Sequence, residues 1–434
     1  MPITVDPVES DRQLPSHADV VVVGGGIIGV STALFLAERG IRTLLCEKGV
    51  IAGEQSGRNW GWCRTMGRDP RELPLAMKSL DLWRGINARI GAETGFRTRG
   101  TFYICPDEAS YRKREAWLPH ARSAGLDCRL LAKEAAKTVL PGASAEWRGG
   151  LHTPGDGVAE PQMAAPAIAE AARKRGAVIM TGCAVRGIEK RDGKVSAVET
   201  EMGRVSCGAV VVAGGVWSSQ FLRPLGIRLP QLKVLASVFR TSPCPDGPET
   251  AAWGPGLALR RRIDGGYTVS EGMVVAEIVP DSFRFFREFL TLLRMERKGI
   301  KFRINSSFLA EARHNSTIYE NSRVLDPPVW QQSIENGWKN LTSTFPAFAS
   351  TAIVQSWSGY IDATPDLLPV ISQCDVVPGL YVSSGYSGHG FGIGLGAGHL
   401  TADLVSGASP IVDPYPFRFA RFTDGTRVRP LAGL

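Results

Sequence analysis

The chain has 434 residues, of which 44% are hydrophobic and 21% charged, and 50 Lys and Arg against 42 Asp and Glu give a formal net charge of +8. This is the composition of an ordinary globular protein, and the length predicts about two to three domains. The positive charge is spread along the sequence and forms no basic stripe, which argues against nucleic-acid binding.

Cysteine spacing and hydropathy indicate the cellular setting. The eight cysteines are scattered, with no CxxC pair and no metal-ligand spacing, so we expect reduced thiols and no metal site. The sequence has no signal peptide pattern, and no apolar run approaches the roughly 18 residues of a membrane-spanning helix. We therefore expect a cytoplasmic protein without an integral membrane segment.

The first strong pattern follows a polar extension at residues 1–17. Residues 19–23 (DVVVV) form a β-branched run typical of a buried parallel strand. This run leads into GGGIIG at 24–29, which has the GxGxxG spacing, and residues 27–40 have a helical pattern. A second strand pattern, TLLCE, covers 43–47. The order strand, glycines, helix, strand and acid predicts a dinucleotide-binding unit.

Each part of this unit has a physical role. Gly24 permits a tight turn, Gly26 lets the backbone approach a pyrophosphate, and Gly29 allows close packing of helix on strand. The pyrophosphate charge would lie at the helix N-terminus, and Glu47 would accept hydrogen bonds from ribose hydroxyls. A carboxylate at this position would repel the 2′-phosphate of NADP, whereas NAD and FAD both fit.

Three later segments combine strands, glycine-rich turns and helices. Residues 155–180 contain a short turn, then Glu160 and Pro161, an amphipathic helix and a strand. Residues 205–221 (VSCGAVVVAGGVWSSQF) place a buried strand before two glycines. Residues 379–407 (GLYVSSGYSGHGFGIGLGAGHLTADLVSG) contain a strand, a very glycine-rich turn and a helix. These segments favour further parts of one flavin site over a separate domain for NAD-dependent catalysis.

With these motifs the sequence resembles the D-amino acid oxidase superfamily of FAD-dependent amine oxidoreductases, which includes sarcosine and glycine oxidases. The matching segments are VVVGGGIIGVSTALFLAERG with Glu47, VAEP with its helix, VVVAGGVWS, TPDLLPVI and GYSGHGFGIG. They follow the family order from residue 19 to about residue 406. The resemblance implies an α/β protein with a Rossmann-type FAD-binding domain, like that of glutathione reductase, and an α+β substrate domain with an antiparallel sheet.

The implied domains are discontinuous. The FAD-binding domain would comprise residues 18–90, 150–221 and 350–434, and the substrate-binding domain residues 91–149 and 222–349. Strand patterns such as KVLASVFRTS and GGYTVSEGMVVAEI suit the antiparallel sheet. A basic amphipathic stretch at 281–305 could face a membrane or a partner, but we favour a helix that packs its apolar side on the substrate domain.

The family pattern implies cofactor contacts in the glycine turn, at the end of the second strand, in the loop after it and in the later turns: Gly24, Gly26, Ile27, Ile28, Gly29, Glu47, Lys48, Ser56, Gly57, Arg58, Asn59, Trp60, Gly61, Val185, Ala213, Gly214, Trp217, Gly359, Gly388, His389, Gly390, Phe391, Gly392 and Ile393. Arg58 is expected to neutralise phosphate charge directly with its guanidinium. Backbone N–H groups of the turn at 388–393 are expected to stabilise negative charge at the N1/O2 edge of the reduced flavin.

Two departures from the family pattern are informative. Members with covalently bound flavin have a cysteine just before the TPD segment, where this sequence has Gly359, so noncovalent FAD is predicted. Sarcosine-oxidase-like members have a lysine after GHGF that helps to hold the substrate carboxylate. Gly392 occupies that position here, so a substrate carboxylate must be bound elsewhere.

The loop at 56–69, SGRNWGWCRTMGRD, supplies the main candidates for substrate binding. It holds two tryptophans and three arginines without helical or strand periodicity. Arg64 is the predicted carboxylate anchor, and Arg68 is the second candidate. Trp60 and Trp62 would wall an apolar pocket, and their indole faces would favour a cationic amine by about 1 kcal/mol.

Three further residues are candidates on the substrate side. Tyr267 and Tyr360 would offer hydroxyl contacts, although packing on a sheet face explains tyrosines in strands equally well. His389 is a candidate acid/base group. We favour a loop residue near the flavin instead, because amine oxidation by flavin needs little help of that type.

These features predict an FAD-dependent oxidase or dehydrogenase that oxidises the C–N bond of an amino acid or a secondary amine. Hydride would pass from the α-carbon of this small-molecule substrate to flavin N5, and the imine would hydrolyse in water. Two alternatives stay open: a 2-hydroxyacid or alcohol dehydrogenase of the same fold, and a flavoprotein subunit of a hetero-oligomeric amine dehydrogenase. The sequence does not distinguish oxidase from dehydrogenase, the chirality of the substrate or the oligomeric state.

Overall fold

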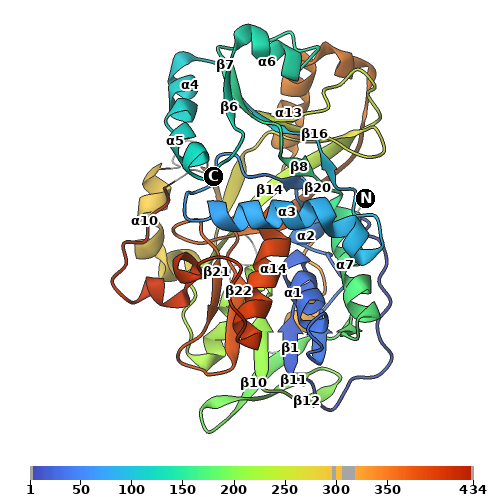
Figure 1. Ribbon diagram of the computed structural model, residues 1–434, viewed down its shortest axis with the longest axis vertical. Helices are drawn as coiled ribbons and strands as arrows, with labels where there is room; N and C mark the ends of the chain where they lie inside the picture. Colours follow the sequence, from blue (N-terminus) through green and yellow to red (C-terminus); the bar gives the residue numbers. More distant parts are fainter. Residues whose placement is uncertain (1–2, 296–299, 305–317, 432–434) are drawn as a thin grey trace.

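The computed structural model describes residues 3–295, 300–304 and 318–431. One part of the molecule is a sheet covered by helices, and the other is a larger sheet with helices around it (Figure 1). The long helix α3 (Leu73–Ile90) crosses between them. No helix within these ranges is long and apolar enough to cross a membrane.

The first sheet is built on the predicted dinucleotide-binding unit. Its strand order is β21-β22-β13-β1-β2-β9, and its neighbouring strands are parallel except for β21 and β22. Val20 of the central strand β1 lies opposite Thr43 on one side and Ala209 on the other. The strands are β1 Val20–Val23, β2 Thr43–Cys46, β9 Val178–Met180, β13 Ala209–Val212, β21 Val370–Gln373 and β22 Leu380–Ser384. The predicted parallel sheet is confirmed.

Three helices pack together beside this sheet: α1 (Ile27–Ala37), α7 (Pro161–Lys174) and α14 (Gly390–Ser406). Every residue of α1 is buried, and α1 contacts both α7 and α14. The contact with α14 depends on small residues, since a Cβ on Gly398 would lie 2.4 Å from the Cβ of Ser31. The glycine repeat that continues from the turn into α14 therefore also serves helix packing.

The large sheet has the strand order β19-β18-β14-β17-β16-β15-β5-β7-β6, and β20 pairs with β14. Most neighbours are antiparallel, as predicted, but β5 with β15 and β18 with β19 are parallel. The strands are β5 Thr101–Cys105, β6 Arg129–Ala132, β7 Gly149–Thr153, β14 Leu232–Thr241, β15 Ala251–Gly254, β16 Leu257–Arg261, β17 Tyr267–Ser270, β18 Val274–Ile278, β19 Ile300–Ile304 and β20 Ile353–Ala363.

Strand β20 joins the two parts of the molecule. It lies in a segment predicted for the FAD-binding domain, yet it pairs with β14 along its length, from Ala363 opposite Leu232 to Ile353 opposite Thr241. Strand β7, also at the edge of a predicted FAD segment, pairs with β5 and β6. The backbone therefore runs without interruption from strands of the large sheet to the first sheet.

The remaining elements are small sheets and peripheral helices. Two small sheets comprise β3 Trp62–Cys63, β4 Arg97–Thr98 and β8 Gly157–Val158, and β10 Val185–Arg191, β11 Lys194–Thr200 and β12 Gly203–Ser206. The other helices are α2 Gln55–Arg58, α4 Glu108–Glu115, α5 Leu118–Ser123, α6 Lys133–Val139, α8 Ser218–Leu222, α9 Pro280–Arg284, α10 Phe286–Met295, α12 Ile318–Asn321 and α13 Gln331–Thr344, with short 3-10 turns at Gly215–Trp217, Arg223–Leu225, Pro346–Ser350, Tyr415–Phe417 and Phe419–Phe422.

The basic stretch at 281–305 differs from its prediction as one helical segment. Helices α9 and α10 cover its first part, but residues 300–304 form β19, which pairs with the edge of the large sheet. An available sheet edge thus overrides the helical pattern there. Phe285, Phe289 and Leu292 are buried as expected for a core-facing helix, whereas Phe283 is exposed. Residues 296–299 and 305 lie outside the described ranges.

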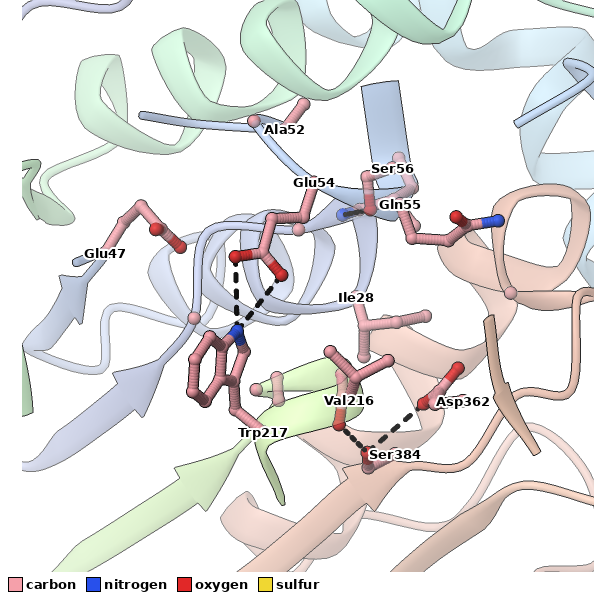
Figure 2. Close-up of a pocket in the computed structure, with 18 of the residues that line it drawn as sticks. Ile28, Glu47, Ala52, Glu54, Gln55, Ser56, Val216, Trp217, Asp362 and Ser384 are labelled. Carbon is pink, nitrogen blue, oxygen red and sulfur yellow. Dashed lines mark hydrogen bonds between the residues drawn. The ribbon is translucent and has the colours of Figure 1, made fainter. Parts of the chain in front are cut away.

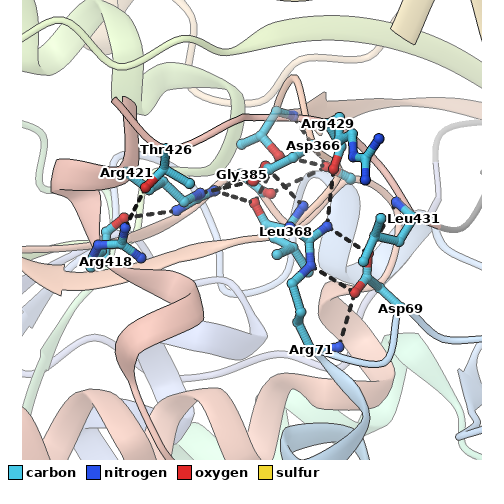
Figure 3. A network of polar contacts seen from close by, with 12 residues as sticks. Asp69, Arg71, Asp366, Leu368, Gly385, Arg418, Arg421, Thr426, Arg429 and Leu431 are labelled. Atoms are coloured by element: carbon cyan, nitrogen blue, oxygen red, sulfur yellow. Dashed lines mark hydrogen bonds and ion pairs between the residues drawn. The ribbon is translucent and has the colours of Figure 1, made fainter. Parts of the chain in front are cut away.

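A buried ion pair holds the C-terminal segment in place (Figure 3). Arg421 Nε donates to Asp366 Oδ2 at 3.0 Å, and its Nη2 donates to the carbonyl of Leu368 at 2.8 Å. The backbone N–H of Leu431 donates to Asp69, which also accepts from Arg71. Asp366 of the TPD motif therefore anchors the C-terminal segment at Arg421, and Asp69, just before α3, anchors it at Leu431.

Candidate functional site

A cleft lies at the carboxyl ends of the parallel strands. Ligands bind at this edge in open α/β sheets. The loop with Glu54, Gln55 and Ser56 lies on one side, and Trp217, Asp362 and Ser384 lie on the other (Figure 2). Predicted site residues in its wall are Gly24, Gly26, Ile27, Ile28, Glu47, Lys48, Ser56, Asn59, Val185, Ala213, Gly214, Trp217, Tyr360, Gly388, Gly390 and Phe391.

The glycine turn at the start of α1 has no room for side chains. Gly24 has φ +110°, and a Cβ on it would lie 2.5 Å from the carbonyl oxygen of Ala213. A Cβ on Gly29 would lie 1.9 Å from the carbonyl oxygen of Gly24. A Cβ on Gly26, which lines the cleft, would lie 2.9 Å from Ser56 Oγ. The turn thus exposes bare backbone and the positive end of α1 to the cleft, an arrangement suited to a phosphate group.

Glu47 and Ser56 shape the same end of the cleft. The Glu47 carboxylate accepts hydrogen bonds from the N–H groups of Gly25 and Gly49, both at 2.7 Å, and burial raises the pKa of Glu47. The Ile27 N–H donates to Ser56 Oγ at 2.9 Å. These contacts tie Glu47 and the loop to the glycine turn. At this position the Glu47 carboxylate could accept hydrogen bonds from the hydroxyl groups of a ribose.

Lys48 is engaged by the protein itself. Its Nζ donates to Glu54 Oε1 at 2.7 Å and lies 4.7 Å from the centre of the Trp217 ring. Trp217 Nε1 lies 3.1 Å from both carboxylate oxygens of Glu54, so that one acid bridges the loop and the opposite turn (Figure 2). The sequence prediction missed Glu54, because a single acid in a loop carries no motif.

Asp362 is a second acid in the cleft that the sequence prediction missed. Its Oδ2 accepts hydrogen bonds from Gly385 N–H at 2.7 Å, Gln231 Nε2 at 3.2 Å and Ser384 Oγ at 3.4 Å. Burial raises the pKa of Asp362 to about 6. It lies two residues beyond Tyr360 on β20, so alternation along a strand was the available signal once that strand had been identified.

We expect Asp362→Asn to raise the melting temperature at pH 8 and to leave it nearly unchanged at pH 4. A carboxyl group with a raised pKa binds more protons when folded, so wild-type stability falls as the pH rises from about 4 to about 6. The amide oxygen can accept the same three hydrogen bonds without the charge, and the gain is at most about 3 kcal/mol. Thermal unfolding at both pH values, with equal flavin content in the two proteins, measures the change in melting temperature.

Asp375→Asn is the matched control, since the same change at an exposed position removes no buried charge. A stabilisation by Asp362→Asn of equal size at pH 4 and pH 8 would contradict the assignment.

Several predicted cofactor residues are not among the described residues that line the cleft: Gly29, Gly57, Arg58, Trp60, Gly61, Gly359, His389, Gly392 and Ile393. Arg58 shows most clearly how such a residue is engaged by the protein. Its guanidinium donates to the carbonyls of Gly53 and Ser358 at 3.0 and 2.9 Å and to Asp326 at 2.6 Å. These acceptors draw the charge away from the cleft, so Arg58 holds the loop against β20.

Arg64 lies among aromatic rings beside the N-terminus of α14. Its guanidinium carbon is 5.4 Å from the ring centre of Tyr103, 5.7 Å from that of Trp253 and 6.0 Å from that of Trp62. Its Nη1 donates to the Met66 carbonyl, and no carboxylate of the described residues lies within 4 Å of it. The guanidinium therefore keeps its charge and further donors for an anion.

The other candidates of this loop have different surroundings. The Trp60 and Trp62 rings contact each other edge to face at 5.4 Å. Arg68 is buried with its Nη1 3.6 Å from Glu72 Oε2, and burial together with the charge of Arg64 lowers the pKa of Arg68 to about 10. His389 Nδ1 lies 3.4 Å from the same oxygen. Burial, reinforced by Arg68, lowers the pKa of His389 to about 4, so this imidazole is neutral near pH 7.

The two predicted tyrosines separate clearly. Tyr267 is fully buried, donates its hydroxyl to the Pro248 carbonyl at 3.1 Å and packs on Phe348, so its hydroxyl is engaged within the core. Tyr360 lines the cleft and donates to Glu277 Oε2 at 2.9 Å. Glu277 also accepts from Arg303 on the neighbouring strand β19. The sequence prediction missed Glu277 and Arg303, because only the pairing of strands in the sheet brings them to Tyr360.

Residues 19–404 match the family model described as FAD dependent oxidoreductase, DAO. The chain belongs to this family. The site and the predicted FAD dependence agree with that membership, since a bare glycine turn, a helix N-terminus and an acid at the end of β2 line one cleft.

Relatives in this family include enzymes of amine oxidation. The chain is 26% identical to the sarcosine oxidase subunit beta of Rhizobium meliloti (94% of this chain, 89% of the relative). It is 25% identical to mouse mitochondrial sarcosine dehydrogenase, of which it spans 44%. Among solved structures, L-amino acid deaminase from Proteus myxofaciens in complex with anthranilate is 34% identical, with a TM-score of 0.92 over 97% of this chain and 96% of that one.

Proposed function

We propose that the protein oxidises the C–N bond of an α-amino acid, with noncovalently bound FAD as the electron acceptor. The observation that carries the proposal is the cleft at the ends of β1 and β2, whose glycine turn exposes backbone where a pyrophosphate would lie. FAD, when bound, would take up the two electrons that leave the substrate carbon. The resulting imine would hydrolyse in water.

An L-amino acid is the proposed substrate. The proposal is supported by 34% identity, over nearly the whole chain, to an L-amino acid deaminase. Arg64 is the proposed carboxylate anchor, because its guanidinium has no carboxylate of the described residues within 4 Å and so no ion pair. Trp62 and Trp253 beside it would contact apolar parts of the substrate. With the proposed boundaries, the substrate domain supplies Trp253, whereas Trp62 and Tyr360 come from segments of the FAD-binding domain.

An anaerobic absorbance screen tests the reaction. The purified yellow protein is mixed with D- and L-amino acids, N-methyl amino acids and 2-hydroxyacids without oxygen. Bleaching of the flavin by L-amino acids is the expected result. Bleaching by a hydroxyacid but by no amine would overturn C–N oxidation and favour the alcohol dehydrogenase alternative. Admission of oxygen then separates oxidase from dehydrogenase by the rate at which the colour returns.

Noncovalent binding of FAD has a separate test. The proposal is supported by Gly359, which lies against Gln55 and Arg58 where related proteins with covalent flavin have a cysteine. Acid precipitation should leave the flavin in the supernatant. Colour that stays with the precipitated chain would contradict noncovalent binding. We also propose a cytoplasmic location, in keeping with the eight free cysteines.

A flavoprotein subunit of a hetero-oligomeric dehydrogenase is a second candidate. The similarity to the beta subunit of a sarcosine oxidase favours it. Flavin reduction by substrate in the purified single chain would argue against a required partner.

A further inference from the structure

Two buried cysteines meet beside the cofactor cleft. The Sγ atoms of Cys46 and Cys183 are 3.9 Å apart, and the Cys183 thiol donates to the sulfur of Cys46. Both residues are buried, and 137 positions separate them in the sequence. Cys46 is the last residue of β2, and Cys183 follows β9, the neighbouring strand. Only the pairing of these strands brings the two sulfurs together.

The pair is joined to the part of the cleft wall that would hold a cofactor. Cys46 itself lines the cleft, and its carbonyl accepts a hydrogen bond from Gly24 N–H at 2.9 Å. The N–H of Cys183 donates to the carbonyl of Glu47 at 2.8 Å. A movement of either cysteine is therefore transmitted to the glycine turn or to the acid at the end of β2.

We propose that Cys46 and Cys183 form a thiol-oxidation site, in which a disulfide forms when the cleft is empty and then weakens the binding of FAD. A disulfide requires an S–S distance near 2.05 Å, so the sulfurs must approach by about 2 Å. That approach displaces Cys46 within the cleft wall and pulls on the backbone beside Glu47. The proposal rests on the noncovalent binding of FAD proposed above.

Hydrogen peroxide is the class of oxidant that fits, because it is a small, neutral two-electron oxidant of thiols and Cys46 lies in the cleft wall. The thiolate of one cysteine of the pair attacks one peroxide oxygen, the O–O bond breaks, and a sulfenic acid and hydroxide result. The sulfur of the other cysteine then displaces the sulfenic oxygen, which leaves as water, and the S–S bond forms. In total two thiols lose two electrons and two protons, and one peroxide becomes two waters.

Thermodynamic linkage makes the effect reciprocal. If the disulfide weakens FAD binding by some factor, bound FAD disfavours the disulfide by the same factor. A cofactor in the cleft would also cover the approach to Cys46. Flavin-loaded protein should therefore be protected, and oxidation should act on chains that have not yet taken up or have lost their cofactor.

The test compares full-length apoprotein with flavin-loaded protein after the same treatment with hydrogen peroxide. Each sample is denatured in the presence of an alkylating agent and mapped by peptide mass spectrometry. We expect the Cys46–Cys183 link in the apoprotein and unlinked cysteines in the loaded protein. We also expect the linked apoprotein to bind FAD at least roughly ten-fold more weakly, measured by flavin fluorescence, and dithiothreitol to restore the affinity.

Two variants serve as controls. Cys183→Ser cannot form the link, so peroxide should leave its FAD affinity unchanged, whereas Cys374→Ser removes another buried cysteine and should behave like the wild type. Failure to link at a peroxide dose that oxidises the partly exposed Cys128 would overturn the proposal, as would unchanged FAD affinity in linked protein. Flavin that cannot be released without breaking a covalent bond would identify noncovalent binding as the step that failed.

Discussion

Replacing Arg64 by alanine is expected to raise the apparent KM for an amino acid by roughly 10- to 100-fold, because a hydrogen bond to a charged group contributes about 1.5–3 kcal/mol. The Arg64 guanidinium has no carboxylate of the described residues within 4 Å and lies beside three aromatic rings. The flavin content of the purified protein should stay close to that of the wild type. Steady-state kinetics and the ratio of flavin to protein absorbance measure the two effects.

The control is Arg129→Ala, which removes an exposed arginine that pairs with Asp127 in the same part of the fold. This variant should keep the wild-type KM. Arg64→Lys should lie between wild type and Arg64→Ala, since lysine keeps the charge but loses the planar fork. An unchanged KM in Arg64→Ala, or an equal rise for an amine that lacks a carboxylate, would remove Arg64 from the substrate site.

Breaking the buried ion pair of Arg260 and Glu160 by Arg260→Met should cost at most about 3–5 kcal/mol of unfolding free energy, because it leaves the Glu160 carboxylate in the interior with only Arg262, at 3.5 Å, as an ionic partner. The guanidinium donates to both Glu160 oxygens at 2.6 and 2.9 Å, and its Nε donates to the Trp60 carbonyl at 2.6 Å. A Cβ on Gly61 would lie 2.9 Å from the same guanidinium. The ion pair thus fixes the loop that carries Arg64, and chemical denaturation measures its contribution.

The pH dependence of this ion pair has a definite sign. Burial alone would raise the pKa of Glu160, but the charge and hydrogen bonds of Arg260 lower it to about 2. A depressed carboxyl pKa adds stability above the ordinary value near 4.5, and this stability is lost as the pH falls towards 2. Arg260→Met should therefore lose most of its difference from wild type in acid.

Two further variants test this prediction. The double variant Glu160→Leu with Arg260→Met should recover part of the lost stability, since neither charge of this ion pair is then left in the interior. Arg112→Met, at an exposed pair with Glu108, should unfold like the wild type. If Arg260→Met were as stable as Arg112→Met, the buried pair would have no role in holding the loop.

Local sequence patterns predicted the glycine turn and the acid at the end of β2. Gly24, Gly26 and Glu47 lie within one strand–turn–helix–strand unit, where backbone geometry leaves little freedom, and all three line the cleft. The glycine-rich turns at 213–217 and 385–392 followed for the same reason, because each comes directly after a parallel strand, β13 or β22. The parallel sheet and the large antiparallel sheet were predictable from the period of apolar residues.

The direction of long side chains was not predictable. Arg58 and Arg64 are six positions apart in the sequence. Arg58 donates to the carbonyls of Gly53 and Ser358 and to the carboxylate of Asp326. Arg64, in contrast, lies among aromatic rings. Tyr267 and Tyr360 both occupy strands of the large sheet, and only Tyr360 reaches the cleft.

The sequence by itself therefore determined the family, the dinucleotide-binding turn and the class of cofactor, because these depend on contacts within short segments. Tertiary structure alone decided which charges face the cleft. It brought Asp362 beside Gln231, Cys46 beside Cys183 and Glu160 beside Arg260, across separations of 131, 137 and 100 residues. Such pairs leave no periodic pattern in the amino-acid sequence, because the free energy that selects them comes from burial and pairing in the folded chain.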